Sequence, residues 1–502
     1  MGLYLSTSGK YRLISPEPQH DPSSRLANIE RVMFPPITEL GFNQLARPLD
    51  NPLTLKHVTT AEYISHLGRP ISFGTRWDTG FPDLQNALLD FARNKLAPPS
   101  ARKITNVLAC LAARFAVEFR PRNERQEDLE HSLVENHMRY CAYADSRLRM
   151  VTIAPSEPLL AEAAFEHLHY FCRWEEVLEI IAANLDTWGI HQGDRGEFVM
   201  GLIWMAARDA VVVKAFPGNV QNRRPWDPYR HSVVFIMDFM KNLLPTGYHQ
   251  ELESMKPSVG DGTAEFQHAF ADCRLWCNHF IQVQDYKVIS TKFLCALLSN
   301  GIGVLCAPNQ AGIDLLWIGL KGDEICEENL VLILGQAQND KSYRTKSNPL
   351  ILDAMDPVKL DICAANRSIP IIRIVFELAS EKPGITLVEP YDRKSPRLKQ
   401  PSKFTSYDFW FAGVDPSTFR CVTAKEAGYY RDLLASSRPI YNPPLPVPRD
   451  LGDLTRLVGL KNETEGNGEA RVNMRRAANT MMMATKPHFP DTWHALLFKE
   501  KD

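Results

Sequence analysis

A carboxylate and two amides lie in two neighbouring predicted strands, at a spacing suited to metal chemistry. Asp314 stands near the start of the apolar run GIDLLWIGL, and Gln336 and Gln338 lie in the following run, NLVLILGQAQ. Because side chains alternate along a strand, the two glutamines project from the same face. Hydrolysis of a phosphodiester needs oxygen ligands for Mg²⁺ and a lysine that positions water and offsets developing charge. Asp314 and Gln336 are therefore candidate metal ligands, and the alternative is a strand-end aspartate beside a polar strand face.

The segment NGIGVLCAPNQAGIDLLWIGL, followed by NLVLILGQAQND, resembles the PD-(D/E)XK nuclease superfamily, in the form found in fungal proteins related to Crinkler-type effectors. Weaker similarity continues through HLGRPISFGTRWD, APSEPLLAEAA, GDRGEFVMGLIWMAARDAV and PIIRIVFELAS, so it covers most of residues 57–415. The resemblance implies a restriction-endonuclease-like core that acts on or binds DNA with Mg²⁺. It places Asp314 at the metal-binding aspartate, Gln336 at the Glu/Gln position and Gln338 at the position of the lysine.

The missing lysine leaves two functions open. An amide at Gln338 carries no positive charge, so a catalytic site needs a lysine from a nearby element. Lys341 is the first candidate, and Lys287 and Lys292, on the preceding helix, are alternatives. That helix offers no convincing glutamate, and the nearest acid is Asp285, at or before its start. The rival hypothesis is a non-catalytic interaction or regulatory protein that keeps the fold as a binding platform. In that case an aspartate at a strand end is satisfied by backbone N–H groups, and the glutamines form a polar strand face.

A basic loop follows the predicted core and could contact phosphates, which is the sequence-independent part of nucleic-acid binding. Its cationic residues are Arg393, Lys394, Arg397, Lys399 and Lys403. A second basic cluster comprises Arg471, Arg475 and Arg476. The alternative is that both clusters are merely solvated. The chain as a whole has 57 Lys and Arg against 59 Asp and Glu, so its net charge of -2 does not attract DNA.

Cys273, Cys277 and His279 form a C-x3-C-x-H pattern that could hold a metal if the two cysteines shared a helix face. A fourth ligand is not evident, and buried thiols are the preferred interpretation. Most of the ten cysteines are dispersed, several inside apolar runs, which favours reduced thiols over disulfides. Because the N-terminus also lacks the apolar core of a signal peptide, we expect an intracellular protein, cytoplasmic or nuclear, that does not span a membrane.

The chain of 502 residues is long enough for two or three domains. We predict an irregular arm at 1–56, a helical domain at 57–260, an α/β domain with a mixed sheet at 265–438, and a Pro-rich tail at 439–502. The class is α+β overall. In relatives of this kind a P-loop ATPase commonly precedes the helical region. Because this chain has no GxxxxGK[ST] motif, we expect any NTPase to be a separate protein partner.

Helical spacing of apolar residues predicts helices in LQNALLDFARNKL, KITNVLACLAARFAVEF, LLAEAAFEHLHYF, WEEVLEIIAANL and RGEFVMGLIWMAARDAVVV. Ser156, which precedes Glu157 and Pro158, is predicted to start the third of these helices. Short apolar runs predict strands in GVLCA, GIDLLWIGL, NLVLILGQA, IPIIRIVFEL and YDFWFAGV. Trp410 and Phe411 are predicted to lie in the core.

Overall fold

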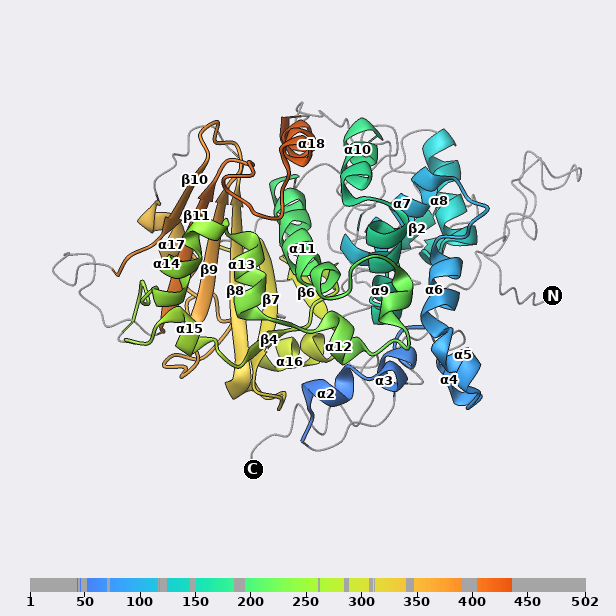
Figure 1. Ribbon diagram of the computed structural model, residues 1–502, viewed down its shortest axis with the longest axis horizontal. Helices are drawn as coiled ribbons and strands as arrows, with labels where there is room; N and C mark the ends of the chain where they lie inside the picture. The colour runs from blue at the N-terminus through green and yellow to red at the C-terminus, as the bar shows by residue number, and fades with distance from the viewer. Residues whose placement is uncertain are drawn as a thin grey trace, which may run out of the picture.

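The computed structural model describes residues 43, 46, 52–69, 73–115, 117, 124–144, 150–184, 195–260, 262–283, 289–306, 310, 312–339, 347–390 and 404–435. The protein has an α+β fold, with a helical N-terminal region followed by a large mixed sheet, as predicted (Figure 1). The tail predicted at 439–502, and the arm before residue 43, lie outside the described residues. No helix among the described residues is long and apolar enough to cross a membrane.

The N-terminal region consists of helices and one short β-hairpin. The elements are α2 (Leu55–Val58), α3 (Ala61–Ser65), α4 (Gly74–Asp78), α5 (Pro82–Asn86), α6 (Leu88–Leu96), α7 (Lys103–Phe115), α8 (Glu124–Asn136), β1 (Tyr140–Ala144), β2 (Met150–Ile153), α9 (Pro158–Glu166) and α10 (Trp174–Asn184). The predicted helices are present. At its C-terminal end α9 widens into a π-helical segment, η3 (His167–Phe171), a geometry that is frequent near functional residues. The β1–β2 hairpin was not predicted.

Within the described residues, nine strands form one mixed sheet. They are β3 (Val234–Phe235), β4 (Cys273–Leu275), β5 (His279–Gln282), β6 (Ile302–Leu305), β7 (Leu315–Lys321), β8 (Leu330–Gln338), β9 (Ile371–Glu377), β10 (Gly384–Leu387) and β11 (Ser406–Ala412). The order is β10-β11-β9-β8-β7-β4-β3, and the parallel pair β5–β6 joins at β7. β7 and β8 are antiparallel, whereas β8, β9 and β11 are parallel.

The central strands are buried on both faces, which explains their nearly continuous apolar runs. Trp410 is fully buried and Phe411 is 1% exposed, so the prediction that both lie in the core is confirmed. The parallel connection from β8 to β9 passes through α17 (Pro349–Ala354).

The helices that follow α10 are α11 (Arg195–Ala215), η4 (Val220–Arg223), α12 (Pro228–Ser232), α13 (Ile236–Leu243), η5 (Thr246–Tyr248), α14 (His249–Ser254), α15 (Phe266–Ala269), α16 (Thr291–Ser299), η7 (Glu327–Asn329) and α18 (Ala424–Ala435). Of these, α11, α13 and α16 pack directly against strands of the sheet. The long α11 lies between the sheet and helices α7 and α9 (Figure 1). It comes so close that a Cβ added at Gly335 of β8 would meet the Trp204 ring at 2.9 Å.

Several contacts join segments that are far apart in the sequence. The Leu55 N–H donates to the Asp323 carbonyl and the Ile325 N–H donates to the Leu53 carbonyl, both at 2.7 Å. Val259 forms a β-bridge with Ser406 at the start of β11. At the other end of the described chain, α18 packs on α10, where the Trp174 indole N–H donates to the Tyr430 hydroxyl at 3.3 Å. The helical region and the sheet therefore share one continuous core.

Candidate metal-binding site

The backbone on both sides fixes Asp314 at the point where β7 begins. The Asp314 N–H donates to the Gly335 carbonyl of β8, and the Asp314 carbonyl accepts from the Cys306 N–H just after β6, both at 2.8 Å. The preceding turn depends on Gly312, which has φ +86 and packs so tightly against the Ala354 carbonyl that a Cβ would meet it at 2.2 Å. Only glycine fits this turn.

The structure brings Asp314 and Gln336 together. Asp314 Oδ2 accepts a hydrogen bond from Gln336 Nε2 and another from the Ala337 backbone N–H, each at 2.7 Å. Since the amide nitrogen of Gln336 faces the carboxylate, its oxygen is directed elsewhere and can act as a ligand. The bond from Ala337 is also the backbone contact expected of a structural aspartate at a strand end.

Gln338 lies two residues further along β8, on the same face as Gln336, and its side chain is half-buried. Its register partner on β9 is Glu377, whose side chain is fully buried. Lys341, Lys287, Asp285 and the basic loop containing Arg393, Lys394, Arg397 and Lys399 lie outside the described residues. Lys292 is half-buried in the first turn of α16.

Two acids close to this part of the sheet were not predicted. Burial raises the pKa of the Cys306 thiol well above its usual value, and the negative charges of Asp314 and Glu197 raise it further, so both carboxylates lie near that thiol. Glu197 belongs to the first turn of α11, where Gly196 packs beside Ala337. Glu197 was not predicted because it is more than 100 residues from Asp314 in the sequence. The second acid, Glu377, could have been noticed because it is a charged residue inside the apolar run IVFEL.

The ligand atoms available around Asp314 are of the chemical type that binds Mg²⁺. A carboxylate and an amide oxygen are the hard ligands that Mg²⁺ prefers, and this ion usually keeps several waters beside one or two protein carboxylates. Within the described part of the chain, no group of three or more His, Cys, Asp or Glu residues could hold a metal ion. A cation here would therefore depend mainly on Asp314, the Gln336 amide oxygen and water.

The C-x3-C-x-H pattern does not lie on a helix. Cys273 belongs to β4 and Cys277 follows it, and both thiols are fully buried. Burial raises the pKa of each thiol to about 12, which opposes the thiolate form that a metal would bind. His279 instead contacts Ser156 and Asn278. The interpretation as buried thiols is confirmed.

A buried network of charges fills the helical region. Asp209 of α11 accepts from Arg114 of α7 at 2.5 and 3.1 Å, from Arg208 at 3.0 Å and from His169 at 2.8 Å. Asp209, Arg114 and Arg208 are fully buried. Burial tends to raise the pKa of Asp209, but the positive charges of Arg114 and His169 outweigh it and hold this pKa below its ordinary value. Asp209 is thus a buried anion with several cationic donors.

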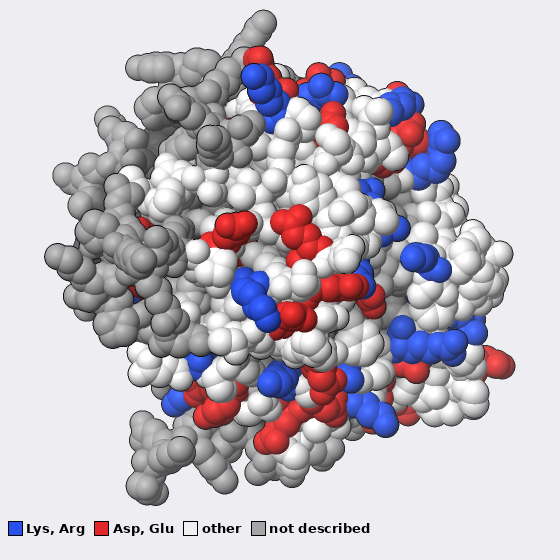
Figure 2. Space-filling model, turned by 60° about the vertical axis from the view of Figure 1, so that its left-hand side comes forward, with Lys and Arg blue, Asp and Glu red and all other residues white. Residues whose placement is uncertain are grey.

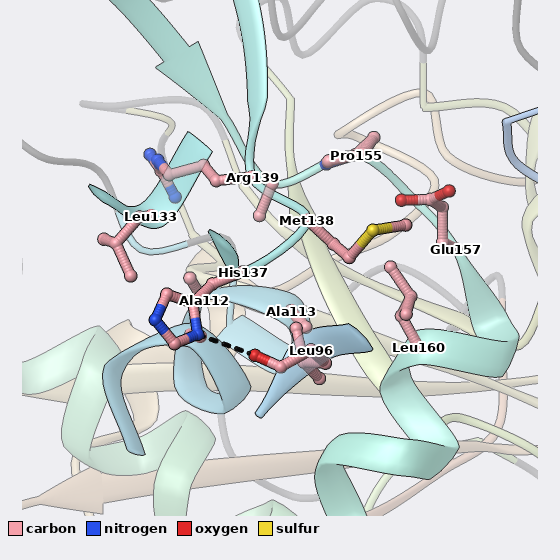
Figure 3. Close-up of a pocket in the computed structure, with 12 residues that line it drawn as sticks. Leu96, Ala112, Ala113, Leu133, His137, Met138, Arg139, Pro155, Glu157 and Leu160 are labelled. Atoms are coloured by element: carbon pink, nitrogen blue, oxygen red, sulfur yellow. Dashed lines mark hydrogen bonds between the residues drawn. The ribbon is translucent and has the colours of Figure 1, made fainter. Parts of the chain in front are cut away.

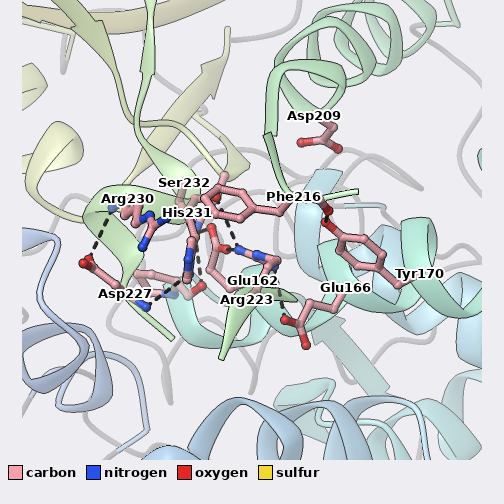
Figure 4. Close-up of polar contacts among 12 residues, drawn as sticks. Glu162, Glu166, Tyr170, Asp209, Phe216, Arg223, Asp227, Arg230, His231 and Ser232 are labelled. Carbon is pink, nitrogen blue, oxygen red and sulfur yellow. Dashed lines mark hydrogen bonds and ion pairs between the residues drawn. The ribbon is translucent and has the colours of Figure 1, made fainter. Parts of the chain in front are cut away.

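The network continues to the carboxylates of α9. Arg223 donates to Glu162 at 3.0 Å and to Glu166 at 3.2 Å, and Figure 4 shows its guanidinium between them. Arg224 also contacts Glu166, through two N–H groups at 2.9 Å each. Paired charges of this kind tolerate burial, because each desolvated ion has donors or acceptors of opposite charge. The network joins α7, α9, α11 and η4 into one unit.

A small cavity of about 20 Å³ lies between α7, α9 and the β-hairpin, enough for about one water molecule. Figure 3 shows apolar side chains around it, with His137 Nδ1 within 2.9 Å of the Leu96 carbonyl oxygen. Because that carbonyl only accepts, His137 Nδ1 carries the proton. At the rim, Glu157 forms an ion pair with Arg69 at 2.6 Å. The cavity is too small for a drug-sized ligand.

The surface gives no support to an extended basic tract on the face shown in Figure 2. Among the described residues of that face, basic and acidic side chains are interspersed (Figure 2). Clefts that steer nucleic acid are usually lined by one sign of charge. The described residues of this face therefore form no extended basic surface of that kind.

The fold and site thus define an α+β protein with a mixed sheet and an aspartate–glutamine pair across neighbouring strands. A family model described as a domain of unknown function, DUF8736, matches residues 98–274, about a third of the chain. The match begins before α7 and ends within β4, so it contains Asp209 and Glu162 but not Asp314. No curated protein and no solved structure matches the chain.

Proposed function

We propose that this chain is a nuclease-like protein of the PD-(D/E)XK type that binds DNA and holds Mg²⁺ at Asp314 and Gln336. The observation that carries the proposal is the 2.7 Å hydrogen bond from Gln336 Nε2 to Asp314 Oδ2 across the ends of β7 and β8. This contact supports the resemblance to the PD-(D/E)XK superfamily, which places Asp314 and Gln336 at the metal-binding positions. The reduced thiols buried in the chain are consistent with a protein that works inside the cell, in the cytoplasm or nucleus.

In this proposal the residues of the chain orient and hold the ion. The Ala337 N–H fixes the orientation of the Asp314 carboxylate, which would coordinate the cation, and the Gln336 amide would contribute a neutral oxygen. Bound Mg²⁺ would supply Lewis-acid activation of a phosphodiester. Gln338 can hydrogen-bond to water or phosphate but cannot offset negative charge. A full rate of cleavage would require a lysine from another element, for which Lys341 is the candidate.

A second function is favoured by the contacts of Asp314 Oδ2. Two donors at 2.7 Å already satisfy this oxygen, as expected for an aspartate with a structural role. The alternative is therefore a non-catalytic platform that uses the same fold to bind DNA or a protein, such as a separate NTPase.

The two functions are separated by incubating the purified full chain with plasmid and with single-stranded DNA in Mg²⁺ or Mn²⁺. Asp314→Ala is the test variant, and Asp353→Ala, at an acid of α17 for which this proposal has no role, is the matched control. The nuclease proposal expects metal-dependent cleavage that only Asp314→Ala abolishes. Cleavage that survives Asp314→Ala would contradict the site, and salt-sensitive binding without cleavage would favour the platform.

A further inference from the structure

Ser156, His279 and Asn278 form a continuous chain of hydrogen bonds outside the candidate metal site. Ser156 Oγ lies 2.8 Å from His279 Nε2, and His279 Nδ1 lies 2.6 Å from Asn278 Oδ1. Ser156 comes just before α9, whereas His279 begins β5, so the contact spans 123 positions of the sequence. These are the distances expected between a nucleophile, its general base and the group that orients the base.

The partners of Asn278 determine the direction of every bond in this chain. Its Nδ2 lies 3.0 Å from Glu162 Oε1 and 3.1 Å from the Pro158 carbonyl oxygen. The carbonyl only accepts, and Glu162 is held ionised because Arg223 and Arg208 outweigh the effect of burial and lower its pKa. The amide nitrogen must therefore be the group facing both acceptors. It follows that Asn278 Oδ1 faces His279 and accepts.

This orientation fixes the tautomer of His279. Since Asn278 Oδ1 can only accept, His279 Nδ1 carries the proton and donates it, and Nε2 keeps its lone pair. Ser156 must then donate its hydroxyl proton to Nε2. Arg114 adds a further constraint, because its Nε donates to the Asn278 carbonyl at 3.1 Å. The buried charge network thus supports the orienting residue, as a second layer of contacts supports a catalytic site.

Ser156 is the accessible member of the three. Its side chain is partly exposed, whereas His279 is 1% exposed and Asn278 is fully buried. α9 begins two residues after this serine, at Pro158, and the N–H groups of its first turn have no acceptors within the helix, a setting that favours negative charge. Pro155 and Glu157, which flank Ser156, line the cavity of about 20 Å³ shown in Figure 3, whereas Ser156 does not. A substrate would therefore reach the Ser156 hydroxyl from its partly exposed side.

We propose that Ser156, His279 and Asn278 form a second reactive centre, a serine nucleophile for acyl transfer from small carboxylic esters. Ser156 Oγ attacks the ester carbonyl while its proton passes to His279 Nε2. The ester C–O bond then breaks, and the leaving alkoxide takes the proton from His279. Water reverses these steps and releases the acid, so no oxidant or other reactant is needed.

His279 is expected to be a weak general base. Burial and the positive charge of Arg114 lower the pKa of His279 to about 3, which keeps the imidazole neutral and able to accept a proton. A histidine that titrates so far below neutrality nevertheless gives slower proton transfer than one tuned to the working pH. We therefore expect a slow reaction whose rate does not fall between pH 7 and pH 5.

The test is covalent labelling of the full chain with a fluorophosphonate probe, followed by intact mass and peptide mass spectrometry. The phosphonate should attach at Ser156, with loss of fluoride, and Ser156→Ala should abolish the label. His279→Gln should slow labelling by about 100-fold, the usual effect of losing a general base. Ser254→Ala, at an exposed serine of α14, is the matched control and should leave labelling unchanged.

Two further measurements keep the result interpretable. Thermal unfolding of each variant shows whether a lost label reflects lost folding, and Ser156→Cys retains a nucleophile at the same position for reaction with p-nitrophenyl acetate. Labelling at another residue, or equal labelling of wild type and a folded Ser156→Ala, would overturn the proposal. The three side chains would then serve only to fasten α9 to β5. This inference is independent of the proposed metal site.

Discussion

Replacing Asp209 with asparagine tests whether the buried charge network stabilises the protein. Asparagine has nearly the same volume, so the substitution removes charge without opening a cavity. Arg114 and Arg208, both fully buried, would then face a neutral amide in place of the carboxylate. Breaking a buried pair by removing one partner costs about 3–5 kcal/mol. Folded proteins are stable by about 5–15 kcal/mol, so Asp209→Asn should remove a large fraction of the total.

The measurement is guanidinium chloride unfolding followed by tryptophan fluorescence. Trp174 is a local reporter, because it stacks on His169 with ring centroids 5.4 Å apart and His169 contacts Asp209. The control is Glu176→Gln, which breaks the solvent-exposed pair with Lys103 and should leave the unfolding midpoint unchanged. A loss below about 1 kcal/mol for Asp209→Asn, comparable with an exposed pair, would refute the reasoning.

Two further predictions concern the candidate metal site and the buried histidine. Gln338→Lys should place a cation next to Glu377 on β9, and should raise metal-dependent cleavage of plasmid DNA above that of wild type; Gln338→Met, similar in length but uncharged, should not. If both variants behave alike, charge at this position is not what limits cleavage. The second prediction is acid destabilisation through His279, whose pKa falls from an ordinary 6.5 to about 3 on folding. Because the unfolded chain binds the proton more readily, this contribution is complete above pH 6.5 and is lost as pH falls toward 3, by about 2 kcal/mol at pH 5. Unfolding midpoints measured from pH 7.5 to pH 4.5 should therefore fall less steeply for His279→Gln; parallel curves would contradict the assignment.

The sheet could be predicted from the sequence because its strands are short apolar runs bounded by polar segments. β7, β8, β9 and β11 were placed correctly, and the period of apolar residues also identified α7, α9 and α11. The β1–β2 hairpin was missed because RYCAYA and MVTIA are short, and the segment DSRLR between them contains neither glycine nor proline. Such local patterns reveal which element a segment forms, but not what packs against it.

The candidate site, too, could be predicted from local patterns only in part. The pairing of Asp314 with Gln336 follows from strand register, and it was predictable once β7 and β8 were assigned as neighbours. Ser156 was predicted only as a helix start, yet the helix cap is Glu157, without a side-chain cap bond, and the Ser156 hydroxyl reaches His279. Glu197 and the charge network likewise depend on contacts between distant segments, which no spacing rule within one element can show.

The long-range pairings at the rim of the sheet have a consequence for biosynthesis. Leu53 and Leu55 bond to segment 323–325, and Val259 bridges to Ser406, which also starts the strand that completes the parallel set. None of these partners exists until most of the chain has been translated, so the segments around Leu53 and Val259 cannot form these pairings before then. Folds dominated by contacts of this kind form slowly and expose strand edges while they do so. This protein should therefore complete its core only after Ser406–Ala412 has left the ribosome, and it should depend on chaperones until then.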